Sequence, residues 1–374
     1  MKVLFAPDSY KGSLSSGQVA ETMARAFQSA DPQVEALLMP MADGGENTLE
    51  ALSKAAPHTK VSITCTGPLG ERRESEYIHL EADCTVIEIA AISGLPLVPE
   101  DQRNPDLTTT YGIGEAIRHA LDQGHRDFIM AIGGSSTNDG GFGMLQALGM
   151  KAFNEQNEEV GMFGKDLFQI SRIDFTTLDS RLQECTIQVA SDVDNPLTGT
   201  RGASYVYGPQ KGADPEQLAA YDQQLAVYGH LVEAACGKDL MHTPGAGAAG
   251  GLGFAFLAIG AELRSGAELV AEAIHLDAAI QEADIVVTGE GQSDEQTLYG
   301  KAPGYVAETA SRYDKPVYLL SGSLDGNMAP LNRFFTGCFS IVPGPKSLAE
   351  CLANAEDYLY QASHQLARVL VQNK

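Results

Sequence analysis

Short apolar runs recur along the chain, and each one ends abruptly in a loop rich in Gly, Asp, Ser and Asn. These runs are predicted strands at residues 3–6, 36–39, 128–132, 187–190, 285–287 and 317–320. Because the runs are continuously apolar rather than alternating, we expect most strands to be buried on both faces, as in a parallel sheet covered by helices. The pattern therefore predicts an α/β protein.

Helix signals separate these strands. Ser15 and Gln18 have the spacing of a capping box ahead of apolar residues at helical intervals. Other helices are predicted at about residues 141–149, 215–236, 266–273, 300–312 and 347–371. From residue 61 to 89 polar and apolar positions alternate instead, which favours hairpin strands. We interpret this block as the start of an inserted mixed α/β domain, residues 61–283, between residues 1–60 and 284–374 of a first domain.

The charge of the chain excludes two classes of partner. Lys and Arg number 25 against 49 Asp and Glu, a net charge of −24. Nucleic acids and membrane surfaces are polyanions that need clustered positive charge, so we expect neither as a partner. No apolar stretch reaches about 18 residues, and the six cysteines form no C-x-x-C pair. We expect a cytoplasmic protein with reduced thiols.

Three lysines stand out in this acidic chain because they lie in or beside glycine loops: Lys11, Lys211 and Lys301. Glycine lets backbone N–H groups approach an anion, and a following helix N-terminus favours negative charge. Acidic residues occur close to the strand ends as well, namely Asp8, Asp43, Glu46, Asp139, Asp192, Asp194, Glu290 and Asp294. Phosphoryl transfer needs this combination: cations and N–H groups for phosphates, carboxylates for Mg²⁺, and one carboxylate to accept a proton.

Two nucleotide-binding motifs bear on this hypothesis. No G-x-x-x-x-G-K-[ST] loop occurs. Residues 245–250 match G-x-G-x-x-G, but Pro244 and a polar segment precede them where a buried strand is required. A nicotinamide-dependent hydroxy-acid oxidoreductase remains an alternative on this motif, and an anion-binding regulatory module is a second one.

Taken together, the loops resemble those of the bacterial glycerate kinase family. The resemblance lies in residues 8–15, 42–48, 132–141, 208–213, 244–253 and 288–301, and the match follows the whole chain in order. It implies ATP- and Mg²⁺-dependent phosphorylation of D-glycerate on its 2-hydroxyl, giving 2-phosphoglycerate. The residues themselves leave the 3-hydroxyl, and hence 3-phosphoglycerate, open. The resemblance also implies a flavodoxin-like parallel-sheet domain built from both chain ends, an inserted second α/β domain, and an active-site cleft between them.

Candidate roles follow from the needs of a small hydroxy acid, whose carboxylate requires donors and whose hydroxyl requires an acceptor. For substrate binding we expect Ser9, Gly133, Gly134, Ser135, Ser136, Thr137 and Asn138. For the nucleotide we expect Gly44, Gly45, Lys211, Gly289, Gly291 and Lys301, and for Mg²⁺ we expect Asp43 and Glu290. The catalytic candidates are Asp8, Lys11 and Asp192, with the choice of base between the two aspartates left open. The sequence also leaves open whether the chain forms a homo-oligomer.

Overall fold

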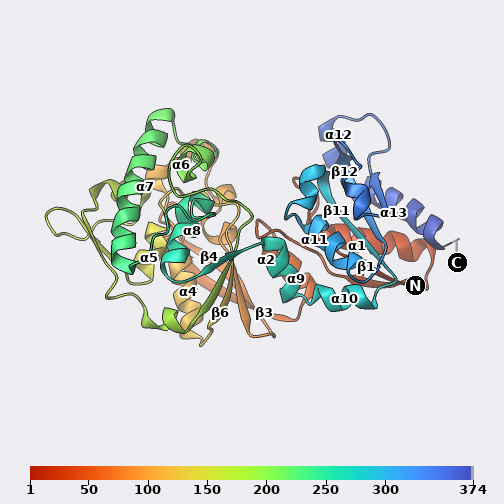
Figure 1. Ribbon diagram of the computed structural model, residues 1–374, viewed down its shortest axis with the longest axis horizontal. Coiled ribbons are helices and arrows are strands. Elements are labelled where there is room, and N and C mark those ends of the chain that lie inside the picture. The colour runs from red at the N-terminus through yellow and green to blue at the C-terminus, as the bar shows by residue number, and fades with distance from the viewer. Residues whose placement is uncertain (372–374) are drawn as a thin grey trace. The chain divides into compact units, whose positions relative to one another are not determined.

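The computed structural model describes residues 1–371, and their contacts divide the chain into two compact units (Figure 1). Unit 1 contains Met1–Asp43, Asn47–Pro57 and the described chain from Ser265 onward, so it joins the red and blue ends of the ribbon. Unit 2 contains Gly44–Glu46 and His58–Arg264. Each unit holds a sheet covered by helices, which confirms the predicted α/β class.

Unit 1 is built on a parallel sheet of five strands in the order β13-β12-β11-β1-β2. The strands are β1 (Lys2–Phe5), β2 (Glu35–Leu38), β11 (Ile285–Ser293), β12 (Val317–Leu324) and β13 (Gly337–Ser340). This is the flavodoxin-like strand order. The chain first adds β2 on one side of β1 and later adds β11, β12 and β13 on the other side, so the order of the strands reverses between β1 and β11. In such sheets ligands bind outside the carboxyl ends of the strands at the reversal point.

The helices of unit 1 cover both faces of this sheet. The predicted capping box opens α1 (Ser16–Ala30): the backbone N–H of Gln18 donates to Ser15 Oγ at 3.3 Å, and the backbone N–H of Ser15 donates to Gln18 Oε1 at 2.9 Å. Helix α1 packs beside α13 (Ala355–Val371) over one face of the sheet, where Phe27 contacts Phe5 edge-on. Strands β1, β11 and β12 also contact α10 (Leu276–Glu282) and α11 (Ala302–Ser311), and α2 (Thr48–Ala55) and α9 (Gly266–Ala273) complete the unit.

Two predictions about unit 1 were wrong in their boundaries. The predicted helix 347–371 is divided into α12 (Leu348–Ala353) and α13 at Asn354, whose φ of −118° and ψ of 18° are not helical and whose side-chain amide donates to the carbonyl of Glu350. The glycines and serines after residues 287 and 320 predict loops, yet β11 and β12 continue through them. Each strand supplies the other's hydrogen-bonding partner, with Glu290 in register with Ser321. Glu290 therefore lies on a strand.

Unit 2 contains a mixed sheet of six strands in the order β10-β9-β6-β5-β4-β3. The strands are β3 (His58–Thr66), β4 (Arg72–Leu80), β5 (Cys84–Glu88), β6 (Asp127–Ala131), β9 (Thr186–Ala190) and β10 (Glu262–Arg264). Strands β3, β4 and β5 pair antiparallel, which confirms the hairpin prediction from alternation, and β5, β6, β9 and β10 pair in parallel. A separate antiparallel pair is formed by β7 (Lys151–Phe153) and β8 (Arg172–Asp174).

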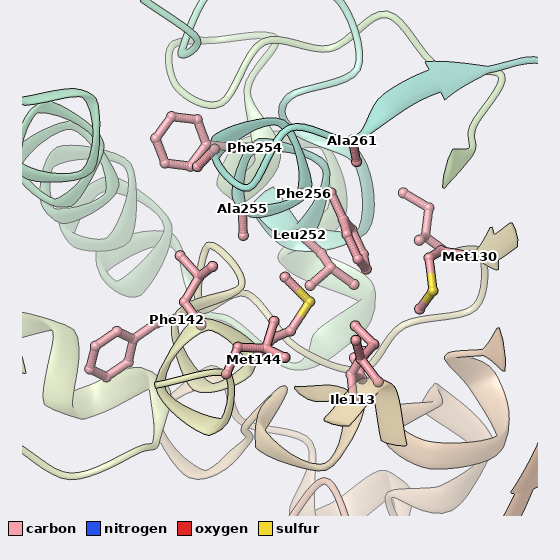
Figure 2. Close-up of a cluster of buried hydrophobic side chains, with 14 of the residues drawn as sticks. Ile113, Met130, Phe142, Met144, Leu252, Phe254, Ala255, Phe256 and Ala261 are labelled. Atoms are coloured by element: carbon pink, nitrogen blue, oxygen red, sulfur yellow. The ribbon is translucent and has the colours of Figure 1, made fainter. Parts of the chain in front are cut away.

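The core of unit 2 lies between this sheet and its helices. Figure 2 shows Met130 of the sheet and the side chains of Ile113, Met144 and Phe256 within one buried cluster. The helices are α3 (Ala90–Ser93), α4 (Tyr111–Asp122), α5 (Phe142–Ala147), α6 (Ala203–Tyr207), α7 (Pro215–Cys236) and α8 (Ala248–Ala258).

The glycine motif at residues 245–250 leads into α8 and not into a dinucleotide turn. Residues 239–247 contain no strand, and Ala249, Gly250 and Gly251 at the start of α8 have positive φ. A Cβ on Gly250 would lie 2.0 Å from the carbonyl oxygen of Thr137, so this glycine permits close packing against the loop after β6. None of the helices in the described part of the chain is long and apolar enough to span a membrane, and all six cysteines are free thiols.

Gly289 tests how tightly β11 and β12 pack. A Cβ there would lie 1.9 Å from the carbonyl oxygen of Leu320, so Gly289→Ala forces the two strands apart. We expect the free energy of unfolding to fall by roughly 2 to 3 kcal/mol, measured by urea denaturation. Gly344→Ala is the matched control because nothing lies within 4 Å of the added carbon. Equal stability of both variants would contradict the packing described here.

Candidate active site

Three carboxylates gather at the carboxyl ends of neighbouring strands in unit 1. Asp8 follows β1, Asp43 follows β2, and Glu290 lies on β11. Pairing continues past β1: the backbone N–H of Asp8 donates to the Gly289 carbonyl at 2.8 Å, and that of Met41 donates to the Pro7 carbonyl at 2.8 Å. Sequence segments far apart in the chain are thereby held side by side at the reversal point of the sheet.

The surroundings of Asp8, including the two other acids, raise the pKa of its carboxyl. Burial first, and then the negative charges of Asp43 and Glu290, raise the pKa of Asp8 to about 7, against a hydrogen bond from the Ser9 backbone N–H at 2.6 Å. Asp8 as a whole residue is half-buried. A buried carboxyl beside two other acids is a place where a proton or a hard cation is stabilised.

Glu290 is fixed in place by side chains that follow it in the sequence. Its Oε1 accepts hydrogen bonds from Ser293 Oγ at 2.9 Å and Thr297 Oγ1 at 2.6 Å, and its Oε2 lies 3.3 Å from Lys301 Nζ. The residue is 7% exposed. Ser293 Oγ also lies 2.7 Å from Ser321 Oγ on β12. Glu290 is thus held in place by two hydroxyl groups and has one lysine beside it.

The loop after β1 carries a second cation. The Tyr10 hydroxyl donates to the Leu320 carbonyl at 2.8 Å and anchors this loop to β12. A Cβ on Gly291 would lie 3.2 Å from the backbone nitrogen of Lys11, so the glycine allows the loop to approach β11 closely. The Lys11 side chain is exposed, and within residues 1–371 it forms no ion pair. It is available to an anion in solution.

In unit 2 the loop after β6 packs against the glycines of residues 44–45. The backbone N–H of Gly133 donates to the Gly44 carbonyl at 3.1 Å, and a Cβ on Gly133 would lie 2.5 Å from Gly45 Cα. Gly134 is exposed, and its φ of +72° is one that glycine adopts readily. The accessible part of this turn is therefore backbone.

The polar side chains that follow in this loop point into unit 2. Ser136 Oγ donates to the Ser93 carbonyl at 2.8 Å, and Asn138 Nδ2 donates to Ser204 Oγ at 3.0 Å. Ser135 and Thr137 are buried as well. Thr137 Oγ1 and Asn138 Oδ1 have no hydrogen-bond partner among the described residues. These groups shape the turn from within.

Lys211 is the buried cation that holds this turn. It is 2% exposed, and its ammonium group donates to Ser135 Oγ at 2.7 Å and to the Thr137 carbonyl at 2.6 Å. Burial lowers its pKa to about 7, although the charge of Asp139 acts in the opposite direction. The sequence predicts this lysine as a nucleotide ligand, and its contacts favour a role in positioning the Gly133–Gly134 backbone through the residues that follow.

Two further acids singled out in the sequence occupy contrasting positions in unit 2. Asp139 is buried and accepts hydrogen bonds from the Thr110 backbone N–H at 3.0 Å, Thr110 Oγ1 at 2.7 Å and the Gly141 backbone N–H at 3.1 Å. Burial raises the pKa of Asp139 despite these donors. It ties the starts of α4 and α5 together. Asp192 lies just after β9 and is exposed.

Several contacts of the site escaped sequence reasoning. The hydroxyls of Ser293 and Thr297 support Glu290, and the spacing of Asp294 and Thr297 is that of a capping pair, which could have revealed them. Ser93 and Ser204 contact the loop after β6 from distant parts of the chain. No local pattern marks such long-range partners.

Strand-end carboxylates at the reversal point of a parallel sheet, with lysines beside glycine turns, define the class of α/β phosphotransferases. The model of the glycerate kinase family matches residues 3–371, and the chain therefore belongs to the glycerate kinase family. This confirms the resemblance found in the loops and places the protein among the kinases.

Individual relatives agree along their whole length. The chain is 44% identical to the glycerate kinase of Bacillus subtilis, over 98% of this chain and 97% of the relative. It is 42% identical to the glycerate 2-kinase of Escherichia coli K12, over 99% of this chain and 98% of the relative. A solved structure described as glycerate kinase 2 from Salmonella typhimurium LT2 is 44% identical, with a TM-score of 0.89 over 100% of this chain and 99% of that one.

The buried lysine gives the stability of the protein a distinct pH dependence. Its folded-state pKa of about 7 lies below the ordinary value of 10.5, so the native state binds fewer protons than the unfolded state above pH 7. Relative to Lys211→Met, the wild-type protein should gain about 2 kcal/mol of unfolding free energy between pH 7 and pH 9. Urea denaturation across this range measures the difference.

The matched control is Lys238→Met, which removes an exposed lysine. We expect its stability difference from wild type to stay constant over the same range. A constant difference for Lys211→Met too would show that Lys211 stays charged in the native state.

Proposed function

We propose that this protein transfers a phosphoryl group from ATP to the 2-hydroxyl of D-glycerate in the presence of Mg²⁺, giving 2-phosphoglycerate. The observation that carries the proposal is the group formed by Asp8, Asp43, Glu290 and Lys301 at the reversal point of the unit 1 sheet. The 42% identity to a glycerate 2-kinase supports the substrate and the position phosphorylated. A cytoplasmic location is part of the same proposal.

Asp43 and Glu290 are the proposed Mg²⁺ ligands. Both offer carboxylate oxygen, the donor that Mg²⁺ prefers. The fit has a basis in the structure: burial and the negative charges around Asp8 raise its pKa, and Lys301 Nζ lies 3.3 Å from a carboxylate oxygen of Glu290. When bound, the ion would neutralise charge on the β- and γ-phosphates of the nucleotide.

Asp8 is the proposed general base, and Asp192 remains the alternative. Asp8 is held by the hydrogen bond from the Ser9 backbone N–H and lies with the other acids at the strand ends, in a half-buried position. A carboxylate so placed can accept the proton of an attacking hydroxyl. Asp192 is exposed and lies just after β9 in unit 2, whereas Asp8 lies beside two other acids.

The remaining roles divide between the two polar loops. We assign the glycerate carboxylate to the backbone of Gly133 and Gly134. Ser135, Ser136, Thr137 and Asn138 shape this turn. Ser9, which follows Asp8 in the sequence, is a further candidate for substrate binding. We assign the phosphates to Lys11, Lys301 and the glycine backbones of Gly44, Gly45, Gly289 and Gly291. Lys211 acts on the turn through its hydrogen bonds. Cations and backbone N–H groups are the usual partners of both anions.

A coupled assay of ADP release tests the reaction. We expect ADP to form only when ATP, Mg²⁺ and D-glycerate are all present, and NMR of the product to show a phosphate on carbon 2. A phosphate on carbon 3 would move the reaction to the 3-hydroxyl. No ADP formation under these conditions would overturn the proposal, and nicotinamide reduction by glycerate would favour the oxidoreductase instead.

Two variants decide between the candidate bases. We expect Asp8→Asn to lower kcat roughly 10²- to 10⁴-fold, because the amide cannot accept a proton. Asp192→Asn should change kcat little. Steady-state kinetics measures both, with Asp194→Asn as control because Asp194 is an exposed acid paired with Arg201. The reverse pattern would make Asp192 the base, and a change confined to KM would make either residue a binding group.

A further inference from the structure

A second group of polar side chains lies at the other edge of the unit 2 sheet. His79 is near the end of β4, Asp83 is in the turn that leads into β5, and His125 is in the loop before β6. One ligand atom from each of the three residues lies within 4.8 Å of the other two. The amino ends of β5 and β6 thus carry two imidazoles and a carboxylate in one place.

The orientation of His79 is set by a buried hydroxyl. His79 Nδ1 lies 3.0 Å from Thr85 Oγ1, and Thr85 is fully buried. The other ring nitrogen, Nε2, lies 3.5 Å from Asp83 Oδ1. Metal-binding histidines usually have this arrangement, in which one nitrogen is held by a hydrogen bond while the other faces the ion.

His125 completes the group from the loop before β6. Imidazole nitrogen is a common ligand of transition metal ions. The rings of His79 and His125 are stacked with centroids 3.8 Å apart and planes inclined by 26°. Since nearly parallel rings direct their lone pairs side by side, binding one ion requires one ring to turn out of the stack.

We propose that His79, Asp83 and His125 form a binding site for a divalent transition metal ion of the Zn²⁺ type. Two imidazole nitrogens and one carboxylate favour Zn²⁺, Co²⁺ or Ni²⁺ over Mg²⁺, and three protein ligands leave a coordination position for water. Neighbouring Cys84 is not among the residues whose ligand atoms gather here.

This metal site is separate from the loop proposed to bind glycerate. That loop follows the carboxyl end of β6, whereas His125 precedes its amino end. The five residues of β6 span roughly 13 Å. The ion would link the turn between β4 and β5 to the loop between α4 and β6, so its role is to hold two connections of the sheet together.

Binding of Zn²⁺ and Co²⁺, each added alone, tests the site in the full chain. Binding is measured by isothermal titration calorimetry in excess Mg²⁺, which keeps sites made of oxygen ligands occupied. We expect about one equivalent to bind wild-type protein, His79→Ala and His125→Ala to lose this binding, and Thr85→Val to weaken it about 10- to 100-fold. His230→Ala should bind as wild type does, because His230 lies on α7 outside the group.

The Co²⁺ spectrum distinguishes nitrogen and oxygen ligands from thiolates elsewhere in the chain. Bands of nitrogen and oxygen ligation that disappear in His125→Ala support the site. Absence of saturable binding, thiolate bands, or equal binding by wild type and His125→Ala would overturn it. Circular dichroism checks that each variant is folded. If His79→Ala does not fold, His125→Ala and Thr85→Val test the metal site instead.

Discussion

The parallel pairing of β2, β1 and β11 is the constraint on which the site in unit 1 depends. Parallel strands end at the same edge of a sheet, so residues separated by most of the chain meet there without any local signal between them. Asp8 and Glu290 meet in this way, and the raised pKa of Asp8 expresses the cost of burying its carboxylate and of placing it beside other acids. The hydroxyls around Glu290 and the ammonium of Lys301 offset part of that cost.

In unit 2, the polar loop after β6 is stabilised by a buried cation. Its cation is inside the protein, where Lys211 joins the Ser135 hydroxyl to the Thr137 carbonyl. A buried ammonium group without an adjacent carboxylate is costly, and the lowered pKa of Lys211 expresses this cost. What the loop gains is a fixed backbone at Gly133 and Gly134, the part that remains accessible. Rigid backbone donors are well suited to a small anion.

The sequence predicted the fold to the extent that its signals were local. Apolar runs located most parallel strands, alternation identified the hairpin of β3 and β4, and the Ser15 capping box placed the start of α1. The signals failed where tertiary pairing overrode composition, as in the glycine- and serine-rich ends of β11 and β12. Site residues were recognisable by type and loop position, but the burial of Lys211 and its partners depends on contacts between distant segments. The residue types of a site are therefore easier to predict from the sequence than the orientation and partners of their side chains.

The position of Glu290 on a regular strand restricts how this segment can change during evolution. Side chains on a strand alternate between two faces, so adding or removing one residue between Ile285 and Glu290 would turn the carboxylate to the opposite side of the sheet. A loop would absorb such a change. We therefore expect chains that share this fold and keep the carboxylate to vary in residue type here while conserving the length of the segment.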